Sequence, residues 1–290
     1  MTALALRRTR VVDVLALLKL RFTPLVLLTT LAGMCIAPGR PGSGLVMLTL
    51  LGVGLIVSGA HALNQYMERE VDARMSRTRD RPLPSGRLAP EVALRIGLGL
   101  PAAGVPLLTL AVNPLTAMLA VVALASYVLC YTPLKRKSEM ALLVGTLPGA
   151  LPPLMGWTAA TGRIGAAGML LFVVLVLWQL PHFLAIAMFR RQDYERAGLK
   201  VWPAERGECA TKWLMVASIA GLVTATALFV PLGMAGTPYL VVSLLAGLVF
   251  LGWAVSGVGR DTRPGWARGL FFVSLGHLTI VLGTLLVVAG

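Results

Sequence analysis

Long apolar stretches, rather than short alternations of apolar and polar residues, set the pattern of this chain. A helix needs about 20 apolar residues to cross ~30 Å of hydrocarbon. Stretches of about that length predict helices over residues 14–37, 45–67, 92–112, 115–132, 140–160, 164–187, 213–232, 237–258 and 267–289. Lys19 and Arg21 interrupt the first stretch, so we expect it to enter at the membrane interface with these side chains extended towards water.

Composition supports this interpretation. The 290 residues are 57% hydrophobic and 13% charged, with a mean hydropathy of +0.81. An ordinary soluble domain carries ~25% charged residues, so this chain has too few to cover a water-facing surface of its size. Disordered chains are poor in apolar residues, which excludes disorder as well. We therefore expect an all-α polytopic membrane protein that forms one domain over residues 1–290.

The charges predict the orientation of the chain. Of the 26 lysines and arginines, only Arg40 and Arg163 fall outside the segments before residue 22 and at 68–95, 133–139, 188–212 and 260–268. The first segment lies before and at the start of the first predicted helix, and the others follow the second, fourth, sixth and eighth. All five therefore lie on one membrane face, which the positive-inside rule places in the cytoplasm. With nine spans, the amino terminus is then cytoplasmic and the carboxyl terminus outside. The net charge of +14 reflects topology and does not indicate nucleic-acid binding.

The chemistry is expected on that face. The inner segments at about 68–91 and 188–212 are long and hold charges of both signs, whereas the outer loops are short. This asymmetry favours a one-sided active site over a pore. A transporter remains an alternative, and it would place polar groups along a path to the outer face. The three cysteines are far apart and have no disulfide or zinc spacing.

An acidic motif ends the second predicted helix. Asn64, Glu68 and Asp72 are spaced at i, i+4 and i+8, which places them on one helix face. Three oxygen-bearing side chains at a membrane boundary suit a hard cation such as Mg²⁺. The alternative is a solvated helix end with Glu–Arg pairs, but Asn64 lies a turn deeper, where an unused polar group is unfavourable.

Basic segments follow. Pro82, Pro84 and Gly86 exclude a helix after the acidic motif, so an irregular loop presents several arginines, including Arg77 and Arg81. Guanidinium groups suit bidentate phosphate contacts. The alternative is that these arginines only set the membrane orientation of the chain, through the positive-inside rule. A further basic run, which contains Lys135, follows the fourth predicted helix. It is a candidate for phosphate binding only because it lies on the same membrane face as the other two motifs.

The sixth predicted helix carries polar residues near its inner end. Gln179, His182 and Asp193 lie near one face of a helix. An isolated histidine in a membrane helix is a candidate for a functional role. For His182 we give equal standing to the alternative that it is a hydrogen-bonded histidine of the core. We interpret His61 and His277 as packing residues.

Taken in order, these motifs closely resemble the intramembrane prenyltransferases of the UbiA superfamily, and within it the branch that farnesylates haem. The resemblance runs from about residue 13 to 210. It rests on the segments Asn64–Asp72, Arg77–Arg87, Tyr131–Arg136, Pro148–Trp157, Trp178–Phe183 and Asp193–Gly198. The first motif marks the superfamily, and the last three strings point to the haem branch.

The resemblance implies an architecture and a reaction. The architecture is nine transmembrane helices around a central cavity open to the cytoplasmic side. The reaction transfers farnesyl from farnesyl diphosphate, with addition of water, to a vinyl group of haem B, giving haem O. Transfer to a quinone precursor or another lipid-soluble acceptor is the alternative within the superfamily. The implied setting is a bacterial plasma membrane, with a haem A synthase or a terminal oxidase downstream.

The resemblance also implies residue roles. Asn64, Glu68, Asp72 and Asp193 would hold Mg²⁺ against the diphosphate. Arg77, Arg81 and Lys135 would neutralise its oxygens, while His182 and Gln179 are the candidates for contacting haem. The chain departs from the pattern of the wider superfamily at three positions. Phe189 stands where a second acidic residue is usual. Glu68 replaces the more usual Asp, and Ala141 stands where Asn is common.

Overall fold

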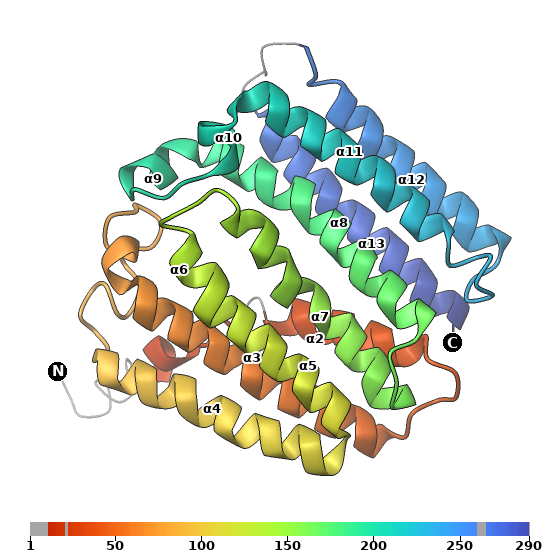
Figure 1. The fold of residues 1–290 in the computed structure, drawn as a ribbon, viewed down its shortest axis with the longest axis horizontal. Helices are drawn as coiled ribbons and strands as arrows, with labels where there is room; N and C mark the ends of the chain where they lie inside the picture. Colours follow the sequence, from red (N-terminus) through yellow and green to blue (C-terminus); the bar gives the residue numbers. More distant parts are fainter. Residues whose placement is uncertain (1–10, 21–22, 260–264, 290) are drawn as a thin grey trace.

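The computed structural model describes residues 11–20, 23–259 and 265–289. These residues form helices and connecting turns, with no strand among them, as expected for an all-α chain (Figure 1). Residues 11–17 are helical. The further helices are α2 (Thr23–Cys35), α3 (Ser43–Asp72), α4 (Pro90–Ala111), α5 (Pro114–Ala125), the π-helical η1 (Ser126–Tyr131), α6 (Thr132–Leu134), α7 (Ala141–Thr161), α8 (Ala166–Phe189), α9 (Arg191–Arg196), α10 (Trp202–Glu205), α11 (Gly207–Ala227), α12 (Thr237–Val255) and α13 (Trp266–Ala289).

Among the described residues, seven helical stretches are long and apolar enough to cross a membrane. They are α3, α4, the continuous α5–η1–α6, α8, α11, α12 and α13. Every predicted stretch contains a helix, but two fall short of a span. The helix α2 has 13 residues, and α7 contains Pro148, Pro152 and Pro153, which lower its apolar character. The chain is therefore a multi-pass membrane protein, and the expected count of nine spans is not confirmed.

The first predicted helix, over 14–37, is divided in the structure. Its first part ends at residue 17, a turn follows over 18–20, and α2 begins at Thr23. Lys19 has a left-handed φ of 49°, which a continuous helix does not allow. The freed carbonyl of Leu17 accepts a hydrogen bond of 2.6 Å from Gln65 Nε2 on α3. The break is thus held in place by a neighbouring helix.

Other boundaries differ near the charged segments. The helix α3 continues to Asp72, five residues beyond its predicted end. The predicted loop 188–212 contains α9 and α10, and α11 already begins at Gly207. The predicted bounds followed the apolar residues only. In both segments charged residues end the apolar stretch, although the backbone remains helical beyond it. The segment after α3 does lack a helix up to α4, as its prolines predict.

The helix α7 lies at the centre, packed against α2, α5 and α8. Its contact with α2 is close: a Cβ on Gly33 would collide with the carbonyl of Pro153, and one on Gly156 with the carbonyl of Thr30. One apolar core joins α7 to α8, α11, α12 and α13, and a second joins it to α3, α4 and α5. The site described below lies between these two groups.

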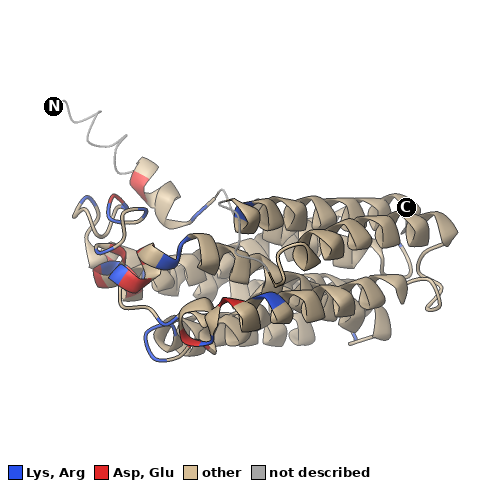
Figure 2. Cartoon of the chain, turned by 90° about the horizontal axis from the view of Figure 1, so that it is seen from above, with Lys and Arg blue, Asp and Glu red and all other residues tan. Residues whose placement is uncertain are grey.

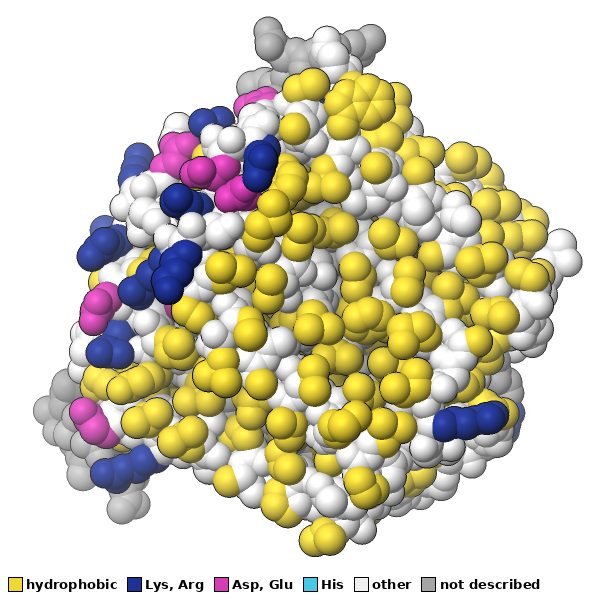
Figure 3. Space-filling model, in the orientation of Figure 1, with side chains coloured by type: hydrophobic (Ala, Val, Ile, Leu, Met, Phe, Trp, Pro, Cys, Tyr) yellow, Lys and Arg dark blue, Asp and Glu magenta, His cyan; other side chains and the backbone are white. Residues whose placement is uncertain are grey.

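Charged residues gather at one end of the helices, where α3 ends and α9 and α10 lie (Figure 2). The face seen in Figure 3 is largely apolar, with charges concentrated along the corresponding edge. This distribution matches the segregation seen in the sequence. The cytoplasmic location of that end remains a prediction. Some of the basic residues that predict it lie outside the described residues, namely Arg7, Arg8, Arg10, Arg21 and those within 260–264.

Candidate active site

The acidic motif occupies the last turns of α3. Asn64, Glu68 and Asp72 all line one cavity of about 300 Å³ at the charged end of the molecule, so the prediction of a shared helix face is confirmed. We call this space the polar cavity. Its wall consists of Lys19, Asn64, Glu68, Val71, Asp72, Met75, Arg77, Arg81, Tyr127, Tyr131, Lys135, Glu139, Ala141, Leu142, Phe183, Ile186, Ala187, Tyr194, Leu199, Lys200, Val201 and Trp202.

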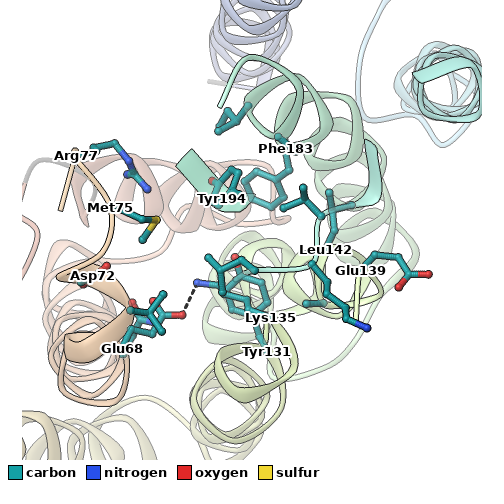
Figure 4. Close-up of a pocket in the computed structure, with 18 of the residues that line it drawn as sticks. Glu68, Asp72, Met75, Arg77, Tyr131, Lys135, Glu139, Leu142, Phe183 and Tyr194 are labelled. Atoms are coloured by element: carbon teal, nitrogen blue, oxygen red, sulfur yellow. Dashed lines mark hydrogen bonds and ion pairs between the residues drawn. The ribbon is translucent and has the colours of Figure 1, made fainter. Parts of the chain in front are cut away.

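An ion pair lies in the wall of the polar cavity. Lys135 Nζ lies 2.9 Å from Glu68 Oε1 (Figure 4). Its ammonium also lies 4.3 Å from the ring centre of Tyr131. Burial alone lowers the pKa of Lys135, but Tyr131 and Glu68 outweigh burial and raise that pKa above its ordinary value. Lys135 therefore remains a fixed positive charge at the cavity wall.

A second ion pair joins α3 to the arginine loop. Arg81 Nη1 lies 2.7 Å from Asp72 Oδ2, and the Asp72 side chain is 2% exposed. The Thr78 hydroxyl donates to the Asp72 backbone carbonyl at 2.8 Å, which fixes the loop against the helix end. Arg77 lines the cavity as well, and it lies beside Met75 in Figure 4. All three cations expected to bind diphosphate thus line one cavity.

The orientation of Asn64 depends on the π-helical segment. Thr132 Oγ1 donates to the carbonyl of Tyr127 at 2.8 Å and accepts from Asn64 Nδ2 at 3.1 Å. The Asn64 amide nitrogen is thereby engaged. Its oxygen Oδ1 accepts instead from Lys19 Nζ at 3.3 Å, and Lys19 also lines the cavity. The π-helix thus helps to present the amide oxygen rather than the nitrogen to the site.

Asp193 approaches from the second charged segment. Its Oδ1 accepts a hydrogen bond of 2.9 Å from Ser76 Oγ in the loop after α3. Its other oxygen, Oδ2, is buried and has no hydrogen-bond partner. The residue itself does not line the polar cavity, whereas its neighbour Tyr194 does. Asp193 is therefore close to the acidic face but is held through Ser76.

The donor set fits a magnesium ion. Within the described ranges, no three His, Cys, Asp or Glu side chains gather closely enough to hold a metal by themselves. Mg²⁺ needs only one or two carboxylates when substrate phosphates and water complete its shell. Asn64 Oδ1 and the carboxylates of Glu68 and Asp72 meet that need. Asp193 Oδ2 is a further buried oxygen without a partner, but Asp193 lies outside the wall of this cavity.

A second space, which we call the apolar cavity, extends beside the first. It measures about 290 Å³. Its wall is Val26, Val53, Ile56, Val57, Ala60, His61, Ala120, Ala123, Leu124, Tyr127, Tyr131, Gly145, Pro148, Gly149, Pro152, Met155, Gln179 and Phe183. Tyr127, Tyr131 and Phe183 line both cavities. A charged compartment therefore meets an apolar one across three aromatic side chains.

The two residues expected to contact haem lie in different surroundings. Gln179 lines the apolar cavity, and its Nε2 donates to the carbonyls of Thr146 and Leu175 at 3.1 and 3.0 Å. His182 lines neither cavity. Its Nδ1 lies 2.7 Å from Ser274 Oγ, and its ring stacks on Trp178 with centres 4.6 Å apart. The structure thus places His182 in a packed, hydrogen-bonded core position.

Lys19, Tyr127 and Phe183 line the site without having been predicted to do so from the sequence. Lys19 was expected to extend towards water, but it instead contacts Asn64 within the polar cavity. Its position in an otherwise apolar stretch was a signal that could have suggested a buried partner. Tyr127 and Phe183 carried no such signal, because aromatic residues are common in apolar helices.

Comparisons with known proteins identify the family of this chain. The sequence matches the UbiA prenyltransferase family over residues 26–276. It is 49% identical over 269 residues to the protoheme IX farnesyltransferase of Anaeromyxobacter dehalogenans, covering 93% of this chain and 91% of that protein.

Solved structures show the same fold. One, from work on a digeranylgeranylglyceryl phosphate synthase, superposes with a TM-score of 0.83 at 17% identity, covering 96% of this chain and 98% of that one. A UbiA homologue from Archaeoglobus fulgidus, bound to DMAPP and Mg²⁺, gives 0.70 at 16% identity and covers 94% and 99% of the two chains. With the family match spanning most of its length, this chain belongs to the UbiA prenyltransferase family.

Proposed function

We propose that this chain transfers a farnesyl group from farnesyl diphosphate, with addition of water, to a vinyl group of haem B, yielding haem O. The observation that carries the proposal is the junction of the polar and apolar cavities at Tyr127, Tyr131 and Phe183. A prenyl diphosphate has the same division into a charged head and an apolar chain. The acceptor is taken from the relatives that bear the name protoheme IX farnesyltransferase.

The diphosphate binds in the polar cavity. Arg77, Arg81 and Lys135 neutralise its oxygens. Burial, with Arg81 and Lys135 nearby, lowers the pKa of Lys19 to about 7, and the negative diphosphate would favour the protonated form of this amine, which would then add a fourth cation. Guanidinium groups offer paired donors to phosphate oxygens, and ammonium groups act as point charges. These charges stabilise the negative charge that grows on the leaving group, which is electrostatic catalysis at a preorganised site.

Asn64, Glu68 and Asp72 would hold the magnesium ion, with Asp193 as the acid of the second motif. When bound, the ion would supply positive charge against the diphosphate oxygens. The Mg²⁺-bound UbiA homologue supports a divalent metal in this fold. The ion pairs to Lys135 and Arg81 keep the two carboxylates oriented towards the cavity until substrate enters.

The reaction proceeds at the junction. The C–O bond of farnesyl diphosphate breaks, and its electron pair leaves with the diphosphate into the polar cavity. The allylic cation forms beside Tyr127, Tyr131 and Phe183, and aromatic rings attract cations. The haem vinyl group attacks that cation, and water captures the carbocation formed on the haem side chain. The apolar wall limits the access of other water molecules.

Gln179 is the haem-facing candidate that lines the apolar cavity. Its amide hydrogens are taken by two backbone carbonyls, which leaves its oxygen as the free acceptor at the wall. A haem contact by His182 stays a prediction, which substitution tests. The setting we propose is a bacterial inner membrane with the charged end in the cytoplasm. Haem O then passes to a haem A synthase or a terminal oxidase.

The test incubates detergent-purified protein with haem B, farnesyl diphosphate and Mg²⁺, with a parallel EDTA sample. Pigments are separated by chromatography and identified by mass. The expected product is a more retained haem, heavier by a farnesyl group and one water, and absent with EDTA. Diphosphate release with an aromatic acid but not with haem would assign the protein to the quinone-type alternative. No transfer to any acceptor would overturn prenyl transfer altogether.

A further inference from the structure

Most of the apolar cavity wall comes from three helical stretches that lead away from the polar cavity. They contribute Val53, Ile56, Val57, Ala60 and His61 from α3, Ala120, Ala123, Leu124, Tyr127 and Tyr131 from α5 and η1, and Gly145, Pro148, Gly149, Pro152 and Met155 from α7. Each stretch reaches the polar cavity at one end, through Asn64 on α3, Tyr131 on η1 and Ala141 on α7. The cavity therefore has a near end at the polar site and a far end along the helices.

Three side chains form the far end of the apolar cavity. They are Val53 on α3, Ala120 on α5 and Met155 on α7, each the wall residue of its stretch that lies furthest along the helix from the polar cavity. We call these three residues the floor. Their side chains are buried, and all three belong to one apolar cluster. The far end is thus closed by packed side chains.

Hydrogen bonds join α5 to α7 one turn beyond the floor. Thr116 lies one turn before Ala120, and Thr158 lies one turn after Met155. The hydroxyl oxygens of these two threonines are 2.9 Å apart, and the Asn113 side chain donates to the carbonyl of Thr158 at 2.9 Å. Because both threonines are buried, parting the helices here would leave polar groups unpaired. The position of the floor is therefore fixed.

The helix α7 gives the length of the apolar cavity. Gly145 lies at the junction, because a Cβ on it would collide with the ring of Tyr131. Met155 follows ten residues later, which corresponds to about 15 Å of helix. A fully extended chain of single bonds advances by about 1.2 Å per bond, so a geranyl chain spans about 8 Å, a farnesyl chain about 13 Å and a geranylgeranyl chain about 18 Å. The farnesyl chain is the one that reaches the floor without exceeding it.

We propose that the floor selects the length of the prenyl donor, with Met155 and Ala120 as the residues that determine this specificity. The proposal rests on the proposed function, to which it adds the reason for a farnesyl donor. A shorter chain leaves the floor uncontacted and loses the apolar area that farnesyl buries there. A longer chain meets side chains that are already closely packed against one another. Farnesyl is thus favoured over its neighbours on both sides.

The experiment offers geranyl, farnesyl and geranylgeranyl diphosphate at equal concentrations in one mixture with purified protein, haem B and Mg²⁺. The masses of the haem products give the relative kcat/KM of the three donors, and these ratios are independent of the amount of folded protein. In parallel, calorimetry measures the dissociation constants of the three corresponding thiodiphosphates, which requires no acceptor. In both measurements the wild-type protein should prefer farnesyl to either neighbour by at least about tenfold.

Met155→Ala removes volume from the floor and should raise the preference for geranylgeranyl relative to farnesyl by at least about tenfold. Its matched control is Leu154→Ala, because Leu154 is buried in the same cluster but lines neither cavity. Ala120→Leu adds volume and should shift the preference towards geranyl instead. Its control is Ala117→Leu, which makes the same change in α5 outside the cavity wall. Both controls should keep the wild-type ratios.

The two floor variants are expected to shift the donor ratio in opposite directions, which a general loss of stability cannot do. Unchanged ratios in Met155→Ala and Ala120→Leu would overturn the proposal, as would equal shifts in the controls or a wild-type protein without preference for farnesyl. If the wild-type protein bound farnesyl thiodiphosphate most tightly but formed no haem product, the assigned acceptor would be wrong. The binding data would then still support selection of the donor by the floor.

Discussion

Lys135 and Glu68 are 67 positions apart in the chain, yet Lys135 Nζ lies 2.9 Å from Glu68 Oε1. The side chain of Lys135 is 23% exposed and that of Glu68 is 12% exposed, so solvent screens their electrostatic attraction less than it would in an exposed pair. It joins the end of the α5–η1–α6 span to the acidic end of α3. The arrangement places a cation and a carboxylate at the same point of the cavity wall, which is where a metal-bound diphosphate requires both.

Lys135→Met should lower kcat/KM for farnesyl diphosphate by about 100-fold or more, because a preorganised charge on the leaving group is lost. Steady-state diphosphate release measures this effect. Lys137→Met is the control: the same substitution two residues away removes an exposed charge outside the cavity and should leave the rate unchanged. Equal rates in the two variants would remove Lys135 from the site.

Asp72→Asn keeps the size of a buried side chain but removes the charge that pairs with Arg81. We expect transfer to fall by about 100-fold or more and the dependence on Mg²⁺ to disappear, while the protein remains extractable as a folded species in mild detergent. A titration of activity against Mg²⁺ tests this. Asp80→Asn, which changes a largely exposed carboxylate, should keep the wild-type curve. Normal turnover in Asp72→Asn would contradict the metal-site assignment.

Lys19→Gln should raise KM for farnesyl diphosphate by roughly 10- to 100-fold with a smaller change in kcat, since a charged contact contributes about 1.5–3 kcal/mol. Lys19→Arg should recover part of the loss. Arg79→Gln, in an exposed pair with Asp80, serves as the control for charge removal at this end. If KM stayed constant in Lys19→Gln, Lys19 would have only a structural role in the break before α2.

Gly149→Ala should destabilise the contact between α7 and α8 by about 1–3 kcal/mol, because the added Cβ would collide with Gln179 Oε1. A lower midpoint of thermal unfolding in detergent is the expected result. Gly99→Ala makes the same change on an exposed face of α4, where nothing lies within 4 Å, and should not lower the midpoint. Similar midpoints for the two variants would show that the helices part easily at Gln179.

His182→Ala distinguishes the two interpretations of that residue. Its bond to Ser274 and its stacking on Trp178 predict a loss of stability of about 1–3 kcal/mol with haem affinity unchanged. The resemblance to the haem branch predicts weaker haem binding before any effect on farnesyl diphosphate. Haem titration followed by absorbance, alongside thermal unfolding, decides between them. A selective loss of haem affinity would establish His182 as a haem contact.

Local patterns were sufficient for much of the site. The spacing of Asn64, Glu68 and Asp72 placed them on one helix face. Pro82, Pro84 and Gly86 correctly excluded a helix from the loop that follows. Both inferences need only the geometry of a single segment. The all-α membrane fold followed in the same way, because apolar stretch length is a local property.

Features that depend on contacts between segments were not predictable. The break before α2 is held by Gln65 on a different helix, which is why Lys19 was expected at the water interface instead of beside Asn64. The π-helical segment likewise depends on Thr132, which bonds to both Tyr127 and Asn64. The position of His182 outside both cavities depends on Ser274, 92 residues further along the chain.

The most direct test of the two-cavity site is a structure with Mg²⁺ and farnesyl thiodiphosphate, whose bridging sulfur slows ionisation. The expected density places the diphosphate within reach of Lys135 and Arg81, with metal between it and Asp72. The farnesyl chain should pass Tyr131 into the apolar cavity. A diphosphate bound away from these residues, or a chain that leaves the polar cavity towards the lipid, would contradict the site described for this protein.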